Sequence, residues 1–76
     1  MARPLSIIAA EIRRDWRNVN YAAKPYLEAM SSLSDIRDNY YHDTGKSVVL
    51  YFLANAGSWR GDVARRIKAE LKEMSK

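Results

Sequence analysis

Apolar residues recur at three- and four-residue spacing through most of the chain, and this pattern predicts helices. The first such set is Leu5, Ile8, Ala9, Ile12, Trp16 and Val19. At about 100° per residue these side chains gather on one face, so the pattern predicts a helix over residues 5–19. The opposite face carries Arg13, Arg14 and Arg17, and Ile7 also points outward.

A second helix is expected after a break marked by Asn18, Asn20 and Pro25, because proline inside a helix removes a hydrogen bond. It begins near Lys24 or Pro25, and its apolar period predicts that it runs to about Tyr41. The residues that keep this period are Tyr26, Leu27, Met30, Leu33, Ile36 and Tyr40. Serines at positions 31, 32 and 34 leave an alternative, in which Ser34 caps a new helix that starts at Asp35.

The segment His42–Gly45 is predicted to be a loop, and Thr44 or Ser47 can cap a third helix over about residues 46–56. Residues 48–54 are apolar on every side, which is typical of a centrally buried helix. The β-branched pair Val48 and Val49 could also indicate a strand. A helix is favoured, because no second strand-like run is present to pair with it.

The fourth helix is expected over residues 59–74, after Gly57 in a left-handed conformation and Ser58 as its N-cap. Its apolar stripe is Trp59, Val63, Ile67, Leu71 and Met74, and its opposite face carries Arg65, Lys68, Lys72 and Lys76. Glu70 lies near the apolar edge and should have a partner, and Arg66 can pair with Glu70 or Asp62. Five residues at the centres of their stripes should be almost fully buried: Trp16, Phe52, Leu53, Ile67 and Leu71.

The fold class predicted from these elements is all-α, a single compact bundle of three to four helices that forms one domain over residues 1–76. A chain of 76 residues has room for one core, and self-association would supplement its stability, so a homodimer is an open alternative. No signal peptide is visible, and the longest apolar run, 48–54, is far shorter than the roughly 20 residues that span a bilayer. We therefore expect a soluble, cytoplasmic protein without a membrane partner.

Few residues in the chain could support catalysis or hold a metal. The absence of cysteine excludes disulfides, thiol catalysis and Cys-type zinc sites, and one histidine cannot build a His-rich metal site. The segment 44–47 ends like a phosphate-binding loop, but Tyr40 stands where that motif needs its first glycine. The cluster at 40–43 joins two tyrosines, His42 and Asp43 without a second histidine, which favours core tyrosines and a polar loop. We expect neither an enzyme nor a bound cofactor.

Charge indicates the classes of partner. The chain has 13 Lys and Arg against 9 Asp and Glu, a net charge of +4, and both ends are basic whereas residues 28–43 are acidic. The main hypothesis is nucleic-acid binding through basic outer faces of the first and fourth helices, with phosphate contacts from Arg13, Arg14, Arg17, Arg65, Lys68 and Lys72. The alternative is a protein-binding inhibitor or adaptor that uses Trp59, Arg60, Asp35, Asp38 and Asp43.

The tryptophan in this second set has two interpretations. Trp59 fills the core beneath a packing corner at Gly61, or it is exposed with Arg60 and contacts a partner, because both residue types are enriched at interface hot spots. The packing corner is favoured.

Several strings also resemble a group of small uncharacterised proteins encoded on bacterial plasmids, integrative elements and prophages. These strings are Arg3–Ser6, Pro25–Met30, Leu50–Ala56, Trp59–Gly61 and Ala64–Leu71. The resemblance implies a bacterial cytoplasm and an accessory role in a mobile element, which favours nucleic-acid handling, regulation or interference with a host protein over metabolism. It assigns no role to any residue.

Overall fold

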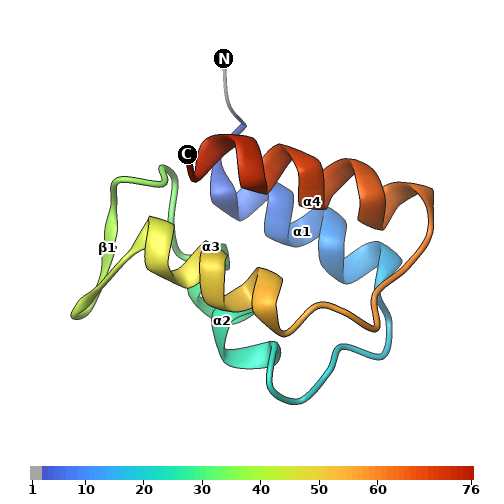
Figure 1. Cartoon of the computed structure of the whole chain (residues 1–76). Helices are drawn as coiled ribbons and strands as arrows, with labels where there is room; N and C mark the ends of the chain where they lie inside the picture. Colours follow the sequence, from blue (N-terminus) through green and yellow to red (C-terminus); the bar gives the residue numbers. More distant parts are fainter. Residues whose placement is uncertain (1–2) are drawn as a thin grey trace.

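The computed structural model describes residues 3–76, which form four helices and one short hairpin (Figure 1). The helices are α1 (Leu5–Asp15), α2 (Lys24–Ser31), α3 (Gly45–Ala54) and α4 (Asp62–Met74). Two strands, β1 (Asn39–Tyr40) and β2 (Asp43–Thr44), pair antiparallel. The predicted helical bundle is confirmed at this level, but the hairpin means that the fold is not purely all-α.

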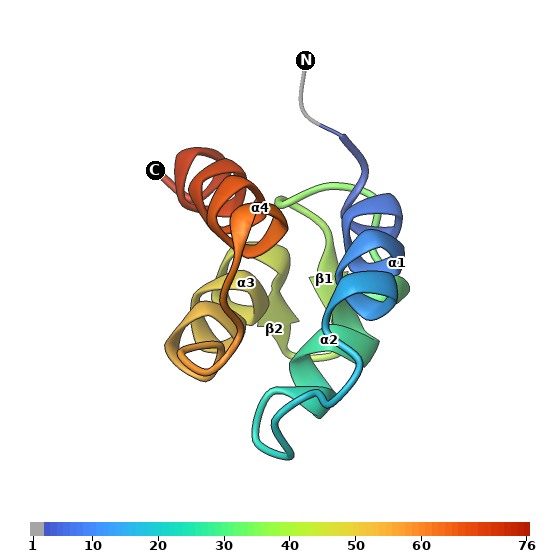
Figure 2. The same cartoon turned by 90° about the vertical axis from the view of Figure 1, so that its right-hand side faces the viewer.

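The helices lie in two layers, with α1 beside α4 and α2 beside α3 (Figure 2). Each helix packs on two others: α1 on α2 and α4, and α3 on α2 and α4. The helices α1 and α4 run in opposite directions, so the end of α1 lies beside the beginning of α4 (Figure 1). The hairpin lies at the opposite end of the molecule from this junction.

All four helices contribute to one core, as their apolar stripes predict. It includes three aromatic rings that contact one another, Trp16, Phe52 and Trp59, which we call the aromatic triangle. Trp16 and Trp59 are stacked with ring centroids 5.7 Å apart, and Phe52 meets them edge-on at 6.2 and 6.4 Å. Four of the five residues expected at stripe centres are buried, but Leu53 is only partly buried.

The helix α3 is not centrally buried, contrary to the expectation from its apolar sequence. Val48, Val49 and Phe52 are buried, whereas Leu50 and Tyr51 are 47% and 53% exposed. The reason is geometric, because α2, α4 and the core cover one side of α3 and leave its outer side to solvent.

The prediction that the second helix continues to Tyr41 is wrong, and so is the alternative of a new helix capped by Ser34. The helix α2 ends at Ser31, whose hydroxyl donates to the Leu27 carbonyl at 3.0 Å. The chain then turns back, and the carbonyls of Leu33 and Ser34 accept hydrogen bonds from the first backbone N–H groups of α1. These free N–H groups at a helix start need acceptors, and the turn supplies them.

The hairpin and the start of α3 depend on two special positions. Tyr41 adopts a left-handed conformation (φ 56°) in the tight turn between β1 and β2. Thr44 caps α3 as predicted, since its hydroxyl accepts from the Ser47 N–H at 3.1 Å. At Gly45 a Cβ atom would lie 2.7 Å from the Ile36 carbonyl oxygen, so the glycine allows the backbone of residues 35–36 to pass close by.

The beginning of α4 also differs from the prediction. The helix starts at Asp62 rather than near residue 59, and its N-cap is Gly61 at φ 114°, not Ser58. Gly57 does not adopt the left-handed conformation, which among the described glycines occurs at Gly61 alone. No atom lies within 4 Å of a Cβ built on Gly61, so this glycine serves backbone conformation and not close packing. None of the helices in residues 3–76 has the length and hydrophobicity to cross a bilayer.

Candidate nucleic-acid interface

The seam between α1 and α4 is closed by ion pairs. The Arg3 guanidinium donates to Glu11 at 2.8 Å and to Glu70 at 2.7 Å, and Arg66 also donates to Glu11. Glu70 therefore has the partner that its position predicts, whereas Arg66 pairs with Glu11 on α1 and with neither Glu70 nor Asp62. The hydrogen bonds from Arg3 lower the pKa of both glutamates. The seam is close to neutral and holds its own counterions.

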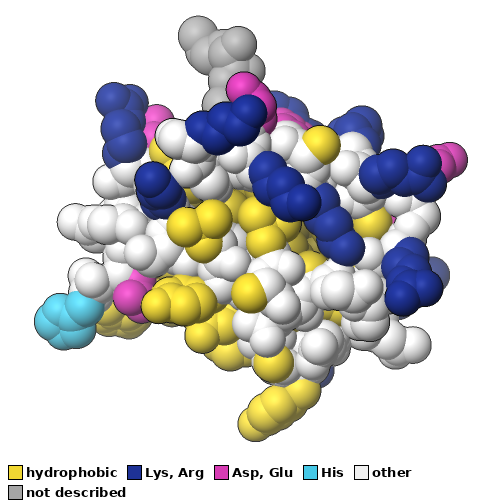
Figure 3. All heavy atoms as spheres, in the orientation of Figure 1, with side chains coloured by type: hydrophobic (Ala, Val, Ile, Leu, Met, Phe, Trp, Pro, Cys, Tyr) yellow, Lys and Arg dark blue, Asp and Glu magenta, His cyan; other side chains and the backbone are white. Residues whose placement is uncertain are grey.

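Two sets of basic residues lie on different sides of this seam. On α4, Arg65, Lys68 and Lys72 share one side through their three- and four-residue spacing, whereas Arg66 faces α1. Arg13 on α1 and Arg17 just after its end line a hollow together with Lys24, the first residue of α2. The basic faces predicted on the first and fourth helices therefore do not form one continuous strip along the α1–α4 seam. Figure 3 shows Lys and Arg side chains over the upper and right-hand parts of one face, above a hydrophobic area.

A hollow lies between the end of α1 and the start of α2, and we call it the α1–α2 hollow. It has a volume of about 380 Å³, and its lining residues are Arg13, Trp16, Arg17, Asn18, Val19 and Lys24. Three of these six carry positive charge and none is acidic. Within residues 3–76 none of the three cations forms an ion pair. A smaller depression beside it, of about 200 Å³, shares Arg13, Val19 and Lys24 and adds Leu27 and one acid, Glu28.

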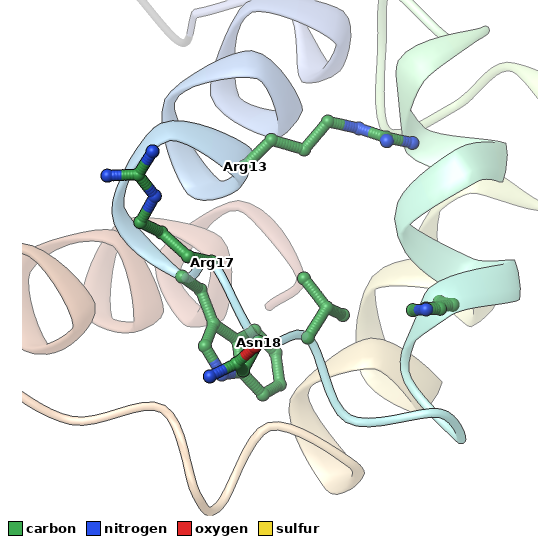
Figure 4. A pocket seen from close by; sticks show the side chains of 6 residues that line it. Arg13, Arg17 and Asn18 are labelled. Atoms are coloured by element: carbon green, nitrogen blue, oxygen red, sulfur yellow. The ribbon is translucent and has the colours of Figure 1, made fainter.

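The cations of the α1–α2 hollow are held apart by the elements that carry them. Arg13 extends from α1 toward α2, whereas the guanidinium of Arg17 points to the opposite side, away from α2 (Figure 4). Lys24 is the first residue of α2. All three are exposed, so they can contact a polyanion without being desolvated beforehand.

A second hollow of about 250 Å³ lies at the start of α4, and we call it the Trp59 hollow. Its lining residues are Trp59, Arg60, Gly61, Ala64, Arg65 and Lys68. The Lys68 Nζ donates to the Trp59 carbonyl at 2.6 Å and lies 5.8 Å from the centroid of the indole ring. Burial, followed by repulsion from Lys72 and Arg60, lowers the pKa of Lys68. An anion bound here would relieve this repulsion.

The aromatic triangle connects the two hollows. Trp16 lines the α1–α2 hollow, Trp59 lines the Trp59 hollow, and the two indoles are stacked on each other. The indole Nε1 of Trp59 donates to Asp15 at 2.8 Å, which fixes the ring against the end of α1. The two hollows therefore lie on either side of one rigid core element, at the end of the molecule where α1 ends and α4 begins.

The six predicted phosphate contacts differ in their surroundings. Arg13 and Arg17 line the α1–α2 hollow, and Arg65 and Lys68 line the Trp59 hollow. Arg14 lies instead in a depression with Glu11, Asp15 and Val63. Lys72 is exposed farther along α4. Lys68 is half-buried and hydrogen-bonded, so it does not face solvent as its helical position suggested.

The residues proposed for protein binding do not form an exposed group. Trp59 is only 2% exposed, which confirms the packing interpretation and removes its indole from the surface; Arg60 is exposed. Asp38 accepts hydrogen bonds from the backbone of Ser34 and Asp35, and Asp35 pairs with Arg37. Asp43 is exposed in β2. Two of the three acids therefore have local roles in the turn before the hairpin.

The cluster at residues 40–43 is the hairpin itself. Tyr40 is half-buried, but Tyr41 is 85% exposed and is not the core tyrosine that was expected. In the described part of the chain no three His, Cys, Asp or Glu side chains come close enough together to hold a metal ion.

Sequence reasoning missed two cations of the interface. From the sequence, Lys24 is named only as a possible start of the second helix, and Arg60 belongs to the protein-binding alternative. The signal for Lys24 was present, because a turn between antiparallel helices brings residues on both sides of it together. Arg60 could not be placed from the sequence, because the expected start of the fourth helix was wrong by three residues.

Comparison of the chain with protein-family models, with curated proteins and with solved structures finds no match.

Proposed function

We propose that this protein is a non-enzymatic accessory protein that binds nucleic acid at the end of the molecule where α1 ends and α4 begins. The observation that carries the proposal is the α1–α2 hollow, which Arg13, Arg17 and Lys24 line without an acidic lining residue or an ion pair among residues 3–76. Cations left unpaired beside a neutral seam are suited to phosphate groups. The accessory role in a bacterial mobile element, which the resemblance implies, is part of this proposal.

The Trp59 hollow supports the same function through a second set of cations. Arg60, Arg65 and the nearby Lys72 are exposed, and repulsion from Arg60 and Lys72 contributes to the lowered pKa of Lys68. Such contacts neutralise phosphates and give affinity without reading base sequence. Of the nearby acids, Glu11 bonds Arg3 and Arg66, and Asp62 accepts from Arg65 at 3.4 Å in an exposed pair that a phosphate would have to replace.

The test is the salt dependence of binding to nucleic acid. Binding of wild-type protein to a labelled duplex and to a single strand is measured by fluorescence anisotropy over a range of salt concentrations. The triple variant R13Q/R17Q/K24Q should weaken binding and flatten the plot of log affinity against log salt by about 2.7 for duplex DNA or 2.1 for a single strand.

The matched control removes the same charge at the opposite end of the molecule. The variant R37Q/K46Q/K76Q changes three exposed cations outside both hollows. It should reduce the slope far less than the first triple variant. Equal effects of the two variants, or no salt-dependent binding by the wild type at low ionic strength, would refute the proposal. The second result would leave the protein-binding alternative as the leading one.

A further inference from the structure

The loop between α1 and α2 holds a tyrosine outward at the edge of the α1–α2 hollow. Tyr21 is 88% exposed, the highest value among the large hydrophobic residues described. Its neighbours in the chain, Val19 and Lys24, both line the hollow. Because two residues span at most about 7 Å, the Cα of Tyr21 lies within that distance of the Cα of Val19. An exposed aromatic ring is therefore carried by the loop segment between two residues that line the hollow.

The exposure of Tyr21 is fixed by the loop. The Asn20 carbonyl accepts from the backbone N–H groups of Ala23 and Lys24 at 2.9 and 3.2 Å, and its side-chain oxygen accepts from Ala22 at 3.0 Å. The Asn20 amide also donates to the Asn55 carbonyl beyond α3 at 3.3 Å. These bonds close a turn around Tyr21, and Ala23 after it is fully buried. The turn anchors both flanks of the ring and leaves the ring itself in water.

We infer that Tyr21 is a stacking platform for a base, and that the ligand of the α1–α2 hollow is a single-stranded nucleic acid. Unpaired bases can stack on an exposed aromatic side chain while nearby cations neutralise the backbone, whereas the bases of a duplex are already stacked on each other. A tyrosine without such a partner would leave a large apolar area in contact with water. This inference rests on the proposed function and adds the class of nucleic acid to it.

The combination predicts how binding responds to sequence. Every base has a flat aromatic face, so one stacking position tolerates all four bases. The cations contact phosphates, which are the same at every position. The affinity should therefore depend on whether the strand carries bases and on whether it is single-stranded or part of a duplex. It should depend only weakly on which base is present.

The experiment compares Y21A with a matched control, Y41A. Tyr41 is 85% exposed, in the hairpin at the other end of the molecule. Binding to labelled oligo(dT) and to a duplex of equal length is measured at low salt. We expect Y21A to weaken oligo(dT) binding by about 5- to 150-fold, the contribution of stacking one base, and Y41A to leave it unchanged. The conservative variant Y21F should retain wild-type affinity, since the ring and not the hydroxyl makes the stack.

A second probe separates stacking from charge. An abasic strand of the same length keeps the phosphates but has no bases, so wild type should bind it as weakly as Y21A binds oligo(dT). Y21A should also keep the wild-type salt slope, because it removes no cation.

The outcomes distinguish the two proposals. Salt-dependent binding that Y21A does not weaken, or equal affinity for abasic strand and oligo(dT), would overturn the stacking inference and leave nucleic-acid binding intact. Equal or tighter binding of the duplex would overturn the single-strand assignment. Absence of any salt-dependent binding would refute the proposed function itself.

Discussion

Phe52 is the residue whose truncation should damage this fold most. Its side chain is fully buried in α3 and meets both Trp16 and Trp59 edge-on in the aromatic triangle. Truncation of a buried phenylalanine to alanine costs about 3–5 kcal/mol. Each aromatic edge contact contributes about 0.5–1.5 kcal/mol beyond the burial of area, and F52A loses two of them. We therefore expect the upper part of that range, a loss of about 4–5 kcal/mol.

This loss is large for a chain of 76 residues. At about 0.05–0.15 kcal/mol per residue, its total free energy of unfolding is about 4–11 kcal/mol. F52A should thus be largely unfolded if the total lies near its lower bound, and should keep at most about 7 kcal/mol if it lies near the upper bound. Its melting temperature should fall by about 16–40 °C, since 1 kcal/mol corresponds to about 4–8 °C in a domain of this size.

Urea unfolding followed by circular dichroism and by tryptophan fluorescence measures the effect. Both tryptophans contact Phe52, so the fluorescence reports directly on the aromatic triangle. The control is L50A on the same helix, where the side chain is 47% exposed and the expected loss is about 1 kcal/mol or less. An unchanged urea midpoint for F52A, or an equal loss in L50A, would refute the assignment of Phe52 to the core.

Two further predictions concern the seam and the start of α3. Because Arg3 lowers the pKa of Glu11 and Glu70, their pairing stabilises the fold fully above about pH 4.5, their ordinary pKa, and this contribution is lost as the pH falls through the lower folded pKa values. Urea unfolding of R3Q should show a weaker loss of stability below pH 4.5 than wild type, and equal pH profiles would contradict the pairing. G45A should lose about 1–3 kcal/mol, because its new methyl group would meet the backbone of residues 35–36. G57A has open space and should unfold at nearly the wild-type urea concentration; equal losses in both variants would contradict the close approach at Gly45.

The helices could be predicted from the sequence because each carries an apolar stripe at helical spacing. The stripes of α1 and α4 placed Ile12, Ile67 and Leu71 in the core, where the structure has them fully buried. The same periodicity failed after α2, where Leu33 and Ile36 keep the helical spacing but lie in a turn. There the local bonds of Ser31 and Asp38 and the caps supplied to α1 stabilise a different backbone.

The hairpin and the start of α4 gave weaker signals. Each strand has two residues, which is too short for an alternating pattern, and the left-handed turn position is occupied by Tyr41 rather than by glycine. At the other boundary, Gly57 and Ser58 matched the usual signals for a helix end and start, but the required positive φ occurs at Gly61. The residues at both boundaries are compatible with several backbone conformations, and packing against the rest of the fold determines which one is adopted.

The candidate interface depends on which groups the neighbouring carboxylates bond, and the sequence alone does not show these partners. Glu11 and Asp15 lie close in sequence to Arg13 and Arg17 and could have neutralised them. In the structure Glu11 faces α4 and bonds Arg3, and Asp15 accepts from the Trp59 indole. The net charge of the whole chain is only +4. Positive charge is nevertheless concentrated at one end of the molecule, because the nearby carboxylates of α1 bond other groups and do not neutralise the arginines. Stability and the proposed binding surface therefore depend on the same distribution of charge along residues 11–17: Glu11 and Asp15 hold the fold, and Arg13 and Arg17 form no ion pair within residues 3–76.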